Sequence, residues 1–273
     1  MMRKIITAFC FLFSLILWAQ VKDSMTRVVR MEGTTNFRDV GGYKTKNGKQ
    51  VVREKVFRSA SLDKLTDRDM KIMDEKSIHT VIDFRGIKEA ERAPDRLNSN
   101  TEYILCSAGS NNIPDKADLK AKLRDGDTFL MSMYGDPGIN YFGERYAPLF
   151  QKLLILPKEE SLLYHCSGGR DRTGMATALL LYALDVPMKT IEADFTASNV
   201  YLKTMNKKLF ASLAKIAEMS EKKMERKMTL KPKFIRTFFK DIKDKYGSIE
   251  AFMEKELGVG EEELDILKSR YTE

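Results

Sequence analysis

Cysteine is scarce in this chain, which has 3 among its 273 residues. Cys10 lies in an N-terminal segment that we expect to be removed, so the mature chain keeps Cys106 and Cys166. Two cysteines are too few for a disulfide framework, and they favour a functional thiol instead. A disulfide between Cys106 and Cys166 under oxidation stays open, because sequence spacing does not give the distance between them.

Long apolar runs are also missing. The longest, residues 5–18 (IITAFCFLFSLILW), has 14 residues, whereas a membrane-spanning helix needs about 20. It follows the basic pair Arg3 and Lys4 and precedes the small residue Ala19, which is the order found in secretory signal peptides. We therefore predict that residues 1–19 are a signal peptide rather than a membrane anchor, and that the protein is secreted or periplasmic.

The chain lacks internal repeats and low-complexity linkers as well. With 43% hydrophobic and 32% charged residues, residues 20–273 are typical of one globular domain. Short β-branched or apolar runs alternate with helical patterns, which predicts an α/β fold with a mostly parallel central sheet flanked by helices. From Pro187 onward the pattern is helical, so we expect residues 187–273 to form a helical extension or lid.

Local patterns place the individual elements. The predicted strands are 26–30, 55–58, 79–84, 102–105 and 161–165. Asn47-Gly48 is typical of a two-residue hairpin turn. The predicted helices are 66–73, 141–156 and 173–184, and Pro187 and Pro232 both suit a helix start.

The segment from His165 to Gly174 reads HCSGGRDRTG and lies between a predicted strand and a predicted helix. In an open α/β sheet, ligands bind beyond the carboxyl ends of the strands. Glycines let the backbone curl tightly, and the N-terminus of the following helix favours an anion. The planar fork of Arg172 can hold two phosphate oxygens. We therefore predict a phosphate-binding loop formed by Ser167, Gly168, Gly169, Arg170, Thr173 and Gly174.

Cys166 is the predicted nucleophile at the base of this loop. A helix N-terminus and nearby cations lower the pKa of a thiol from about 8.5. The thiolate can then attack phosphorus and form a phosphocysteine, which water hydrolyses. Arg172 and the loop N–H groups are placed to stabilise the transition-state charge. Thr173 is suited to donate its hydroxyl to the sulfur, and His165 to order the loop. A buried structural cysteine is the alternative, but it would not require these residues at fixed offsets.

The signature HCxxGxxRTG is that of cysteine-dependent tyrosine and dual-specificity phosphatases. Further segments resemble the bacterial tyrosine/serine phosphatase family, some of whose members also hydrolyse phosphoinositides: NFRDVGGY (36–43), FRS (57–59), VIDFR (81–85) with Glu89, DFTASN (194–199) and YGS (246–248). The resemblance implies the α/β phosphatase fold, no metal or other cofactor, and the roles given above to Cys166 and Arg172. That family often has Lys where this chain has Arg170, so a cation is kept but a bulkier one.

Two aspartates compete for the role of general acid, which must protonate the leaving oxygen. Asp171 lies inside the loop, and the resemblance favours it. Asp136, thirty residues before Cys166 in the sequence GDPG, lies close to where many tyrosine phosphatases keep their acid on a loop. Its proline and glycine neighbours are equally typical of an ordinary turn.

Supporting residues are expected at the predicted strand ends and adjoining loops. They either orient the phosphate loop or form structural ion pairs, and they are Arg38, Asp39, Arg58, Asp83 and Arg85. On a later helical pattern, Asp194, Ser198 and Asn199 are assigned a structural role.

Charge is uneven along the chain. Residues 203–245 contain 14 Lys/Arg and 5 Asp/Glu, a net +9, whereas the whole chain has +8. This segment is either a solvated helical face or a basic surface that attracts anionic membranes or phosphopeptides. No nucleic-acid-binding motif accompanies the charge, so a nucleic-acid partner is not predicted.

These features predict a phosphatase that hydrolyses phosphotyrosine, and also phosphoserine or phosphothreonine, through a phosphocysteine. One alternative is a phosphoinositide or inositol-phosphate phosphatase, which the Arg170-Asp171 pair favours. A second alternative is a catalytically inactive phosphate-binding module, against which the intact Cys166 and Arg172 argue.

Overall fold

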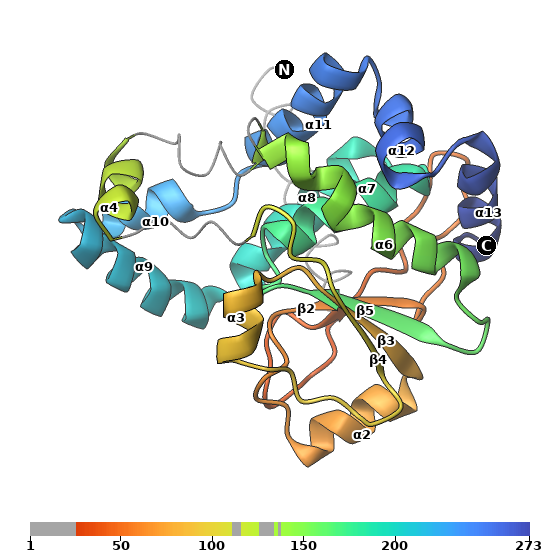
Figure 1. The fold of residues 1–273 in the computed structure, drawn as a ribbon, viewed down its shortest axis with the longest axis horizontal. Coiled ribbons are helices and arrows are strands. Elements are labelled where there is room, and N and C mark those ends of the chain that lie inside the picture. Colours follow the sequence, from red (N-terminus) through yellow and green to blue (C-terminus); the bar gives the residue numbers. More distant parts are fainter. Residues whose placement is uncertain (1–25, 111–115, 126–133, 136–137) are drawn as a thin grey trace, which may run out of the picture.

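A computed structural model describes residues 26–110, 116–125, 134–135 and 138–273 of the chain. Within these residues a five-stranded sheet has the order β1-β2-β5-β3-β4; β1 is antiparallel to β2, and the other neighbours are parallel. The predicted mostly parallel sheet is therefore confirmed (Figure 1). Its strands are β1 (Arg38–Asp39), β2 (Val56–Ser59), β3 (Ile78–Asp83), β4 (Glu102–Leu105) and β5 (Ser161–His165).

The expectation of a strand at residues 26–30 was wrong. Val28 forms an isolated bridge with Arg38. Beside it there are two backbone hydrogen bonds: the Val29 N–H donates to the Phe37 carbonyl, and the Asp39 N–H donates to the Arg27 carbonyl. The ladder stops there because the Asp39 carboxylate accepts the N–H of Gly41 and so bends the chain away. The Asn47-Gly48 turn is present, but its flanking pairing is one bridge.

Strand β5 divides the core into two parts, because successive side chains of a strand point to opposite faces. Leu163 packs on one face with Phe57 and Val81 in a small cluster that α2 covers. Leu162 and Tyr164 point to the other face, where they join the main hydrophobic cluster. The central strands β2, β3 and β5 are therefore buried on both faces, as expected for parallel strands, whereas the edge strand β4 is largely exposed.

Helices make up most of the remaining chain, and the helical pattern predicted after Pro187 is confirmed. Thr66 caps α2 with a capping box, and Pro232 is the first residue of α11. The helices are α2 (Asp67–Glu75), α3 (Ile87–Arg92), α4 (Lys116–Arg124), the 3-10 helix η1 (Gly138–Tyr141), α6 (Phe142–Ile155), α7 (Arg172–Ala183), α8 (Met188–Tyr201), α9 (Lys203–Ala217), α10 (Glu221–Met228), α11 (Pro232–Tyr246), α12 (Ile249–Leu257) and α13 (Glu261–Tyr271).

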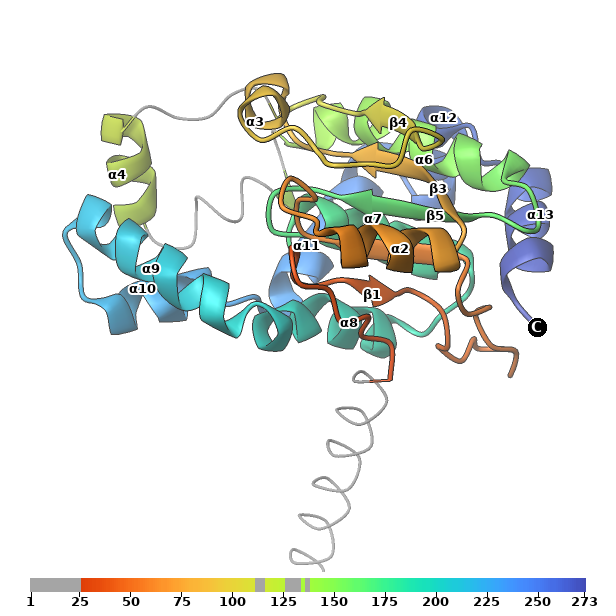
Figure 2. The same cartoon turned by 90° about the horizontal axis from the view of Figure 1, so that it is seen from below.

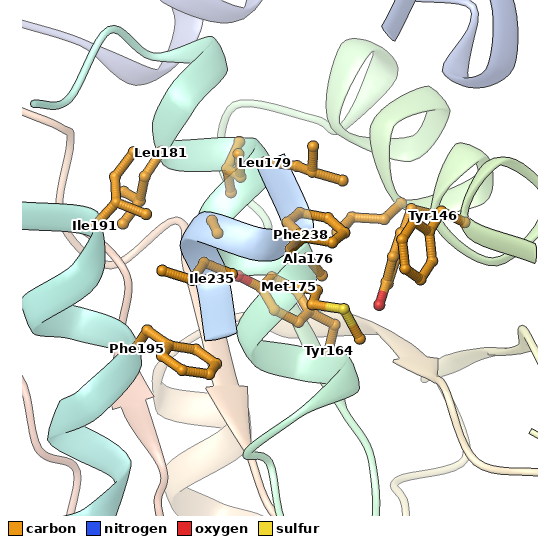
Figure 3. Packing of buried hydrophobic residues seen from close by; sticks show 14 of the residues in the cluster. Tyr146, Tyr164, Met175, Ala176, Leu179, Leu181, Ile191, Phe195, Ile235 and Phe238 are labelled. Carbon is orange, nitrogen blue, oxygen red and sulfur yellow. The ribbon is translucent and has the colours of Figure 1, made fainter. Parts of the chain in front are cut away.

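Helix α7 is the centre of the main cluster, with buried residues around almost its whole circumference. Figure 3 shows its side chains packed between Tyr164 of the sheet and Phe195 and Phe238 of α8 and α11. A side chain such as Leu179 contributes roughly 2 kcal/mol by this burial. At Gly174 a Cβ atom would lie 2.9 Å from the Phe195 ring, so the glycine allows α8 to pack closely. The N-terminus of α7 is therefore firmly held.

Helices α4, α9 and α10 form a separate group beside the sheet (Figures 1 and 2). α9 continues from α8 after a break at Leu202 and packs against both α4 and α10. Across the described ranges, no helix has the length and apolar character needed to cross a membrane. The predicted signal peptide, residues 1–19, lies outside them.

Candidate active site

The carboxyl ends of three neighbouring strands meet at one edge of the sheet. The register pairs Ser59 of β2 and Asp83 of β3 with His165, the last residue of β5. Residues 166–171 follow directly and lead into α7. The predicted strand–loop–helix arrangement is therefore present, at the position where open α/β sheets bind ligands.

The backbone of the loop is held from outside. Gly169 has a φ of +59°, and a Cβ atom there would lie 2.1 Å from the carbonyl oxygen of Ser59, so no other residue fits. Asn36 Nδ2 donates to the Gly169 carbonyl at 2.7 Å and to the Gly168 carbonyl at 3.2 Å. Arg58 Nη2 also donates to Gly169, at 2.9 Å. Carbonyls bound in this way cannot point at an anion inside the loop.

Cys166 lies at the base of the loop and is 3% exposed. Burial alone would raise the pKa of its thiol, but the positive charge of Arg172 and the neighbouring hydroxyl and N–H of Thr173 outweigh burial and lower that pKa. The arrangement therefore favours the thiolate, which is the nucleophilic form.

Arg172 is anchored by Glu89 of α3. Its Nη1 and Nη2 donate to the two Glu89 oxygens at 2.7 and 3.2 Å, and they also reach the Phe84 carbonyl at 3.1 Å and Ser167 Oγ at 3.2 Å. Burial would raise the pKa of Glu89, but the bonds from Arg172 and Ser167 lower it to about 2. Glu89 therefore stays ionised and fixes the orientation of the guanidinium.

Asp171 also lies in the loop, and its carboxylate accepts hydrogen bonds from Arg170 Nε at 2.9 Å and Nη2 at 3.2 Å. The hydroxyl of Tyr134 donates to its Oδ1. Burial would raise the pKa of Asp171, but Arg170, Tyr134 and Arg172 together lower it. The rival acid, Asp136, lies outside the described residues.

Arg170 is turned inward, with only 5% of its surface exposed. Besides its pair with Asp171, its Nη1 donates to the Met228 carbonyl at the end of α10, at 3.2 Å. It therefore joins the loop to the C-terminal helices.

A pocket of about 380 Å³ opens above the loop. The loop side chains and backbone form its floor, whereas its wall comes from α9 and α10. The wall residues are Met205, Asn206, Leu209 and Met228. The helices following Pro187 thus border the site, and a mostly apolar wall lies beside a polar floor.

Residues 29–273 match the sequence pattern of the tyrosine phosphatase family. The chain belongs to this family. It is 28% identical to a provisionally named tyrosine-protein phosphatase of Cupriavidus necator, over 66% of each chain. It is 27% identical to a tyrosine-protein phosphatase of Nostoc commune, over 53% of this chain and 48% of the relative. It is 26% identical to a triple specificity protein phosphatase of Mycobacterium tuberculosis, over 63% of this chain and 69% of the relative. The matches thus span about half to two thirds of the relatives' lengths.

Around the family signature, Arg58 belongs to a buried charge cluster. Its Nη1 pairs with Asp194 Oδ2 at 2.7 Å, and Arg38 Nε pairs with Asp194 Oδ1 at 3.4 Å. Arg38 also donates to Ser198 Oγ at 3.3 Å, and Tyr43 donates to Asp194 at 3.0 Å. Asp194 therefore holds Arg58, the arginine that binds the Gly169 carbonyl, whereas Ser198 holds Arg38 beside it. Asn199 instead bonds both backbone groups of Leu230, before α11.

A second buried cluster lies beneath Cys166. His165 Nε2 is 2.9 Å from Asp95 Oδ2, and Arg85 pairs with Asp83 at 2.7 Å and with Asp95 at 2.9 Å. Burial would lower the pKa of His165, but Asp95 and Asp83 raise it. Asp83, Asp95 and His165 lie within reach of one cation, but the Arg85 guanidinium already pairs with both carboxylates, so the donor set does not fit a metal.

Within the described part of the chain, the side chains of Asp39 and Cys106 make no hydrogen bond to the loop. The Asp39 carboxylate accepts the N–H groups of Gly41 and Glu54 at 2.8 and 3.0 Å, and so shapes the connection after β1. Cys106 is a buried free thiol, as is Cys166, and burial raises the pKa of Cys106 to about 12. Cys106 is therefore poorly suited to nucleophilic chemistry.

Several contacts were missed by the sequence reasoning. Glu89 was noted only as part of a motif, and Asn36 likewise, whereas Asp95 and Tyr134 were not considered. The capping position of Glu89, whose carboxylate accepts the Gly86 N–H at the start of α3, is visible in sequence. No local signal relates Tyr134 to a loop 37 residues away.

Proposed function

We propose that the protein is a phosphatase that hydrolyses phosphomonoesters, foremost phosphotyrosine and also phosphoserine or phosphothreonine, through a phosphocysteine. The observation that carries the proposal is the buried Cys166, whose pKa is lowered by Arg172 and Thr173 at the floor of an open pocket. A merely structural cysteine would have a raised pKa in such a buried place.

In the first step the Cys166 sulfur attacks phosphorus, so the S–P bond forms while the bond to the leaving oxygen breaks. Asp171, in its protonated form, gives its proton to that oxygen. The loop N–H groups and Arg172 stabilise the charge on the equatorial oxygens. Glu89 keeps Arg172 in place for this task.

In the second step a water molecule attacks phosphorus and passes its proton to the Asp171 carboxylate. The S–P bond breaks, inorganic phosphate forms and the thiolate returns. The interaction with Thr173 that favours the thiolate also makes sulfur a better leaving group. The sum is phosphomonoester and water converted to alcohol and phosphate.

Asp171 must gain a proton before it can act as an acid. Its neighbours keep it ionised in the free protein, but a bound dianion raises the pKa of an adjacent carboxyl group. The assignment is tested with Asp171→Asn and Asp136→Asn. The variant of the true acid should lose most activity on a phosphate ester with a poor leaving group and little on one with a good leaving group. If Asp171→Asn behaves like wild type on both, Asp136 or another group is the acid.

The catalytic proposal is tested with an aryl phosphate. Wild type should release phosphate, and Cys166→Ser should reduce the rate to background while binding of phosphate persists. Activity that survives in Cys166→Ser would refute the phosphocysteine mechanism. Binding without turnover in wild type would instead support the phosphate-binding module.

A phosphoinositide substrate is the second candidate, and charge near the pocket favours it. Arg170 is on the pocket floor, and α9 carries Lys203, Lys207, Lys208 and Lys215 with no acidic residue. Such a basic helix would also attract an anionic membrane. Turnover of phosphopeptides and of phosphoinositides in vesicles, with Cys166→Ser as control, separates the candidates. Faster turnover of the lipid would favour this second reading.

We also propose that the protein is exported, on the basis of the basic, apolar and small-residue order at its N-terminus. When the full chain is expressed in a bacterium, the mature protein should appear outside the cytoplasm with a mass reduced by about the first 19 residues. An intact mass in the cytoplasmic fraction would contradict this.

A further inference from the structure

The contact between Tyr134 and Asp171 joins the loop to the helical layer. Tyr134 is 0% exposed. Its ring stacks on Phe234 of α11, with 5.5 Å between centroids and 12° between planes, and meets Phe195 of α8 edge-on at 5.6 Å. The aromatic neighbours therefore fix the ring, and its hydroxyl is aimed at Asp171 Oδ1.

The hydrogen bonds of Asp171 are distributed unequally between its two oxygens. Among the residues that the structure describes, Oδ1 accepts from Tyr134 and from Arg170 Nη2, whereas Oδ2 accepts from Arg170 Nε alone. A carboxylate oxygen offers about two lone-pair positions. Oδ1 is therefore saturated, and Oδ2 keeps the free position on which a proton can sit.

Arg170 alone cannot fix this arrangement, because it is the neighbour of Asp171 in the same loop. The two side chains can move together, and within the described part of the chain Arg170 is tied elsewhere only to the Met228 carbonyl. Tyr134 is the donor that reaches Asp171 from outside the loop. Asp171 also lines the pocket, and 19% of its side chain is exposed there.

We infer that Tyr134 is a positioning residue: its hydroxyl holds Asp171 so that Oδ2 carries the proton given to the leaving group. The inference rests on the proposed function, in which Asp171 is the general acid. Tyr134 itself neither gains nor loses a proton in the reaction; it acts only through Asp171.

The charged and titratable groups that act on Asp171 set the expected pH dependence. Arg170 and Arg172 favour its carboxylate, as does the Tyr134 hydroxyl, whereas the Cys166 thiolate opposes it. Removing the hydroxyl should raise the pKa of Asp171. The acid would then stay protonated to higher pH, and the descending alkaline limb of kcat would move upward.

The test is Tyr134→Phe, which keeps the ring and its stacking. We expect kcat to fall about tenfold on a phosphate ester with a poor leaving group and less than twofold on one with a good leaving group, because general acid catalysis contributes about 10²–10⁴. The midpoint of the alkaline limb of kcat should shift to higher pH by about one unit, which corresponds to the loss of one hydrogen bond to a charged group. Tyr271→Phe is the matched control, since its buried hydroxyl donates to the Leu153 carbonyl away from the loop.

Two further measurements separate positioning from a structural effect. In an Asp171→Asn background, Tyr134→Phe should cause no additional loss, because the hydroxyl acts through Asp171. In a second variant, 3-fluorotyrosine replaces Tyr134; its hydroxyl is a stronger donor and the side chain has nearly the same size, so the alkaline limb of kcat should move to lower pH. If Tyr134→Phe does not fold, this second variant tests the inference instead.

The outcomes distinguish the inference from the proposed function. If Asp171→Asn behaves like wild type on both esters, the proposed acid is wrong. If Asp171→Asn shows the loss expected of an acid but Tyr134→Phe matches wild type in leaving-group dependence and pH limb, the role of Tyr134 is refuted. An additional loss in the double variant also refutes it.

Discussion

Glu89 offers the sharpest perturbation of the loop, because it supports the transition-state arginine without touching the reacting atoms. It binds Arg172 through both oxygens, accepts the Ser167 hydroxyl at 2.6 Å, and accepts the Gly86 N–H at 2.9 Å. Glu89→Gln keeps the shape of the side chain but removes its charge. Glu54→Gln is a matched control, since Glu54 pairs with Lys76 on the surface.

The magnitude follows from the pKa of Glu89, which is lowered from 4.5 to about 2. At 1.36 kcal/mol per unit, this corresponds to roughly 3 kcal/mol of stabilisation. The Glu89 side chain is 20% exposed, so screening reduces the expected loss in Glu89→Gln to about 2 kcal/mol. Because the folded pKa is depressed, this stabilisation is fully present above about pH 4.5 and disappears as pH falls toward 2.

Denaturant unfolding at pH 7 and at low pH measures this contribution, and steady-state kinetics measure the effect on catalysis. We expect Glu89→Gln to lose about 2 kcal/mol at pH 7 and progressively less as pH falls below 4. We expect kcat to fall about ten- to hundredfold, since a misplaced donor loses roughly 1–3 kcal/mol of transition-state stabilisation. A variant that matches Glu54→Gln in both measurements would refute the reasoning.

Two further predictions concern the loop itself. Because the pKa of Cys166 is lowered, the rate of its alkylation by iodoacetate should have a pH midpoint below the ordinary thiol value of about 8.5. Arg172→Met should move this midpoint to higher pH. Equal midpoints in the two proteins would contradict the role given to Arg172. Gly169→Ala should lose at least about 2 kcal/mol in thermal or denaturant unfolding, because strain at positive φ adds to the clash with Ser59; Gly48→Ala, where a Cβ atom meets nothing within 4 Å, is the control that shares a positive φ.

The helices and strands were predictable where the local sequence pattern favours the same structure as the tertiary packing around it. Strands β4 and β5 match the predicted ranges because each is a short run bounded by polar or turn residues. Helix α2 begins after Thr66 as its capping signal indicates. The expected strand at 26–30 failed because its partner, β1, is two residues long. The length of a strand depends on how far its neighbour stays alongside it, and residues 26–30 do not encode the length of β1.

The site was predictable where its residues are contiguous. The signature places Cys166, Arg170 and Thr173 around one centre because strand, loop and helix follow directly. Its supports come from distant segments: Asn36, Glu89 and Tyr134 reach the loop only through the sheet order and the packing of α3, α8 and α11. Those contacts depend on tertiary structure, so a single sequence shows the residues but not their partners.

The charges around the loop lead to a last prediction. With the Cys166 thiolate, the Asp171 carboxylate and Glu89 facing two arginines, the site already carries an excess of one negative charge. A dianion adds two more, so binding should raise the pKa of the most responsive carboxyl group. Glu89 is fixed by four hydrogen bonds, whereas Asp171 keeps a position on Oδ2 that no described residue occupies.

We therefore expect Asp171 to take up a proton when a dianion binds. Calorimetry of sulfate binding at pH 6, in buffers of different ionisation enthalpy, counts the protons directly, because sulfate itself stays a dianion at this pH. Wild type should take up close to one proton more than Asp171→Asn. Equal uptake by the two proteins would mean that the proton sits elsewhere, and Asp171 would then reach the leaving group without the charge change that its role as an acid requires.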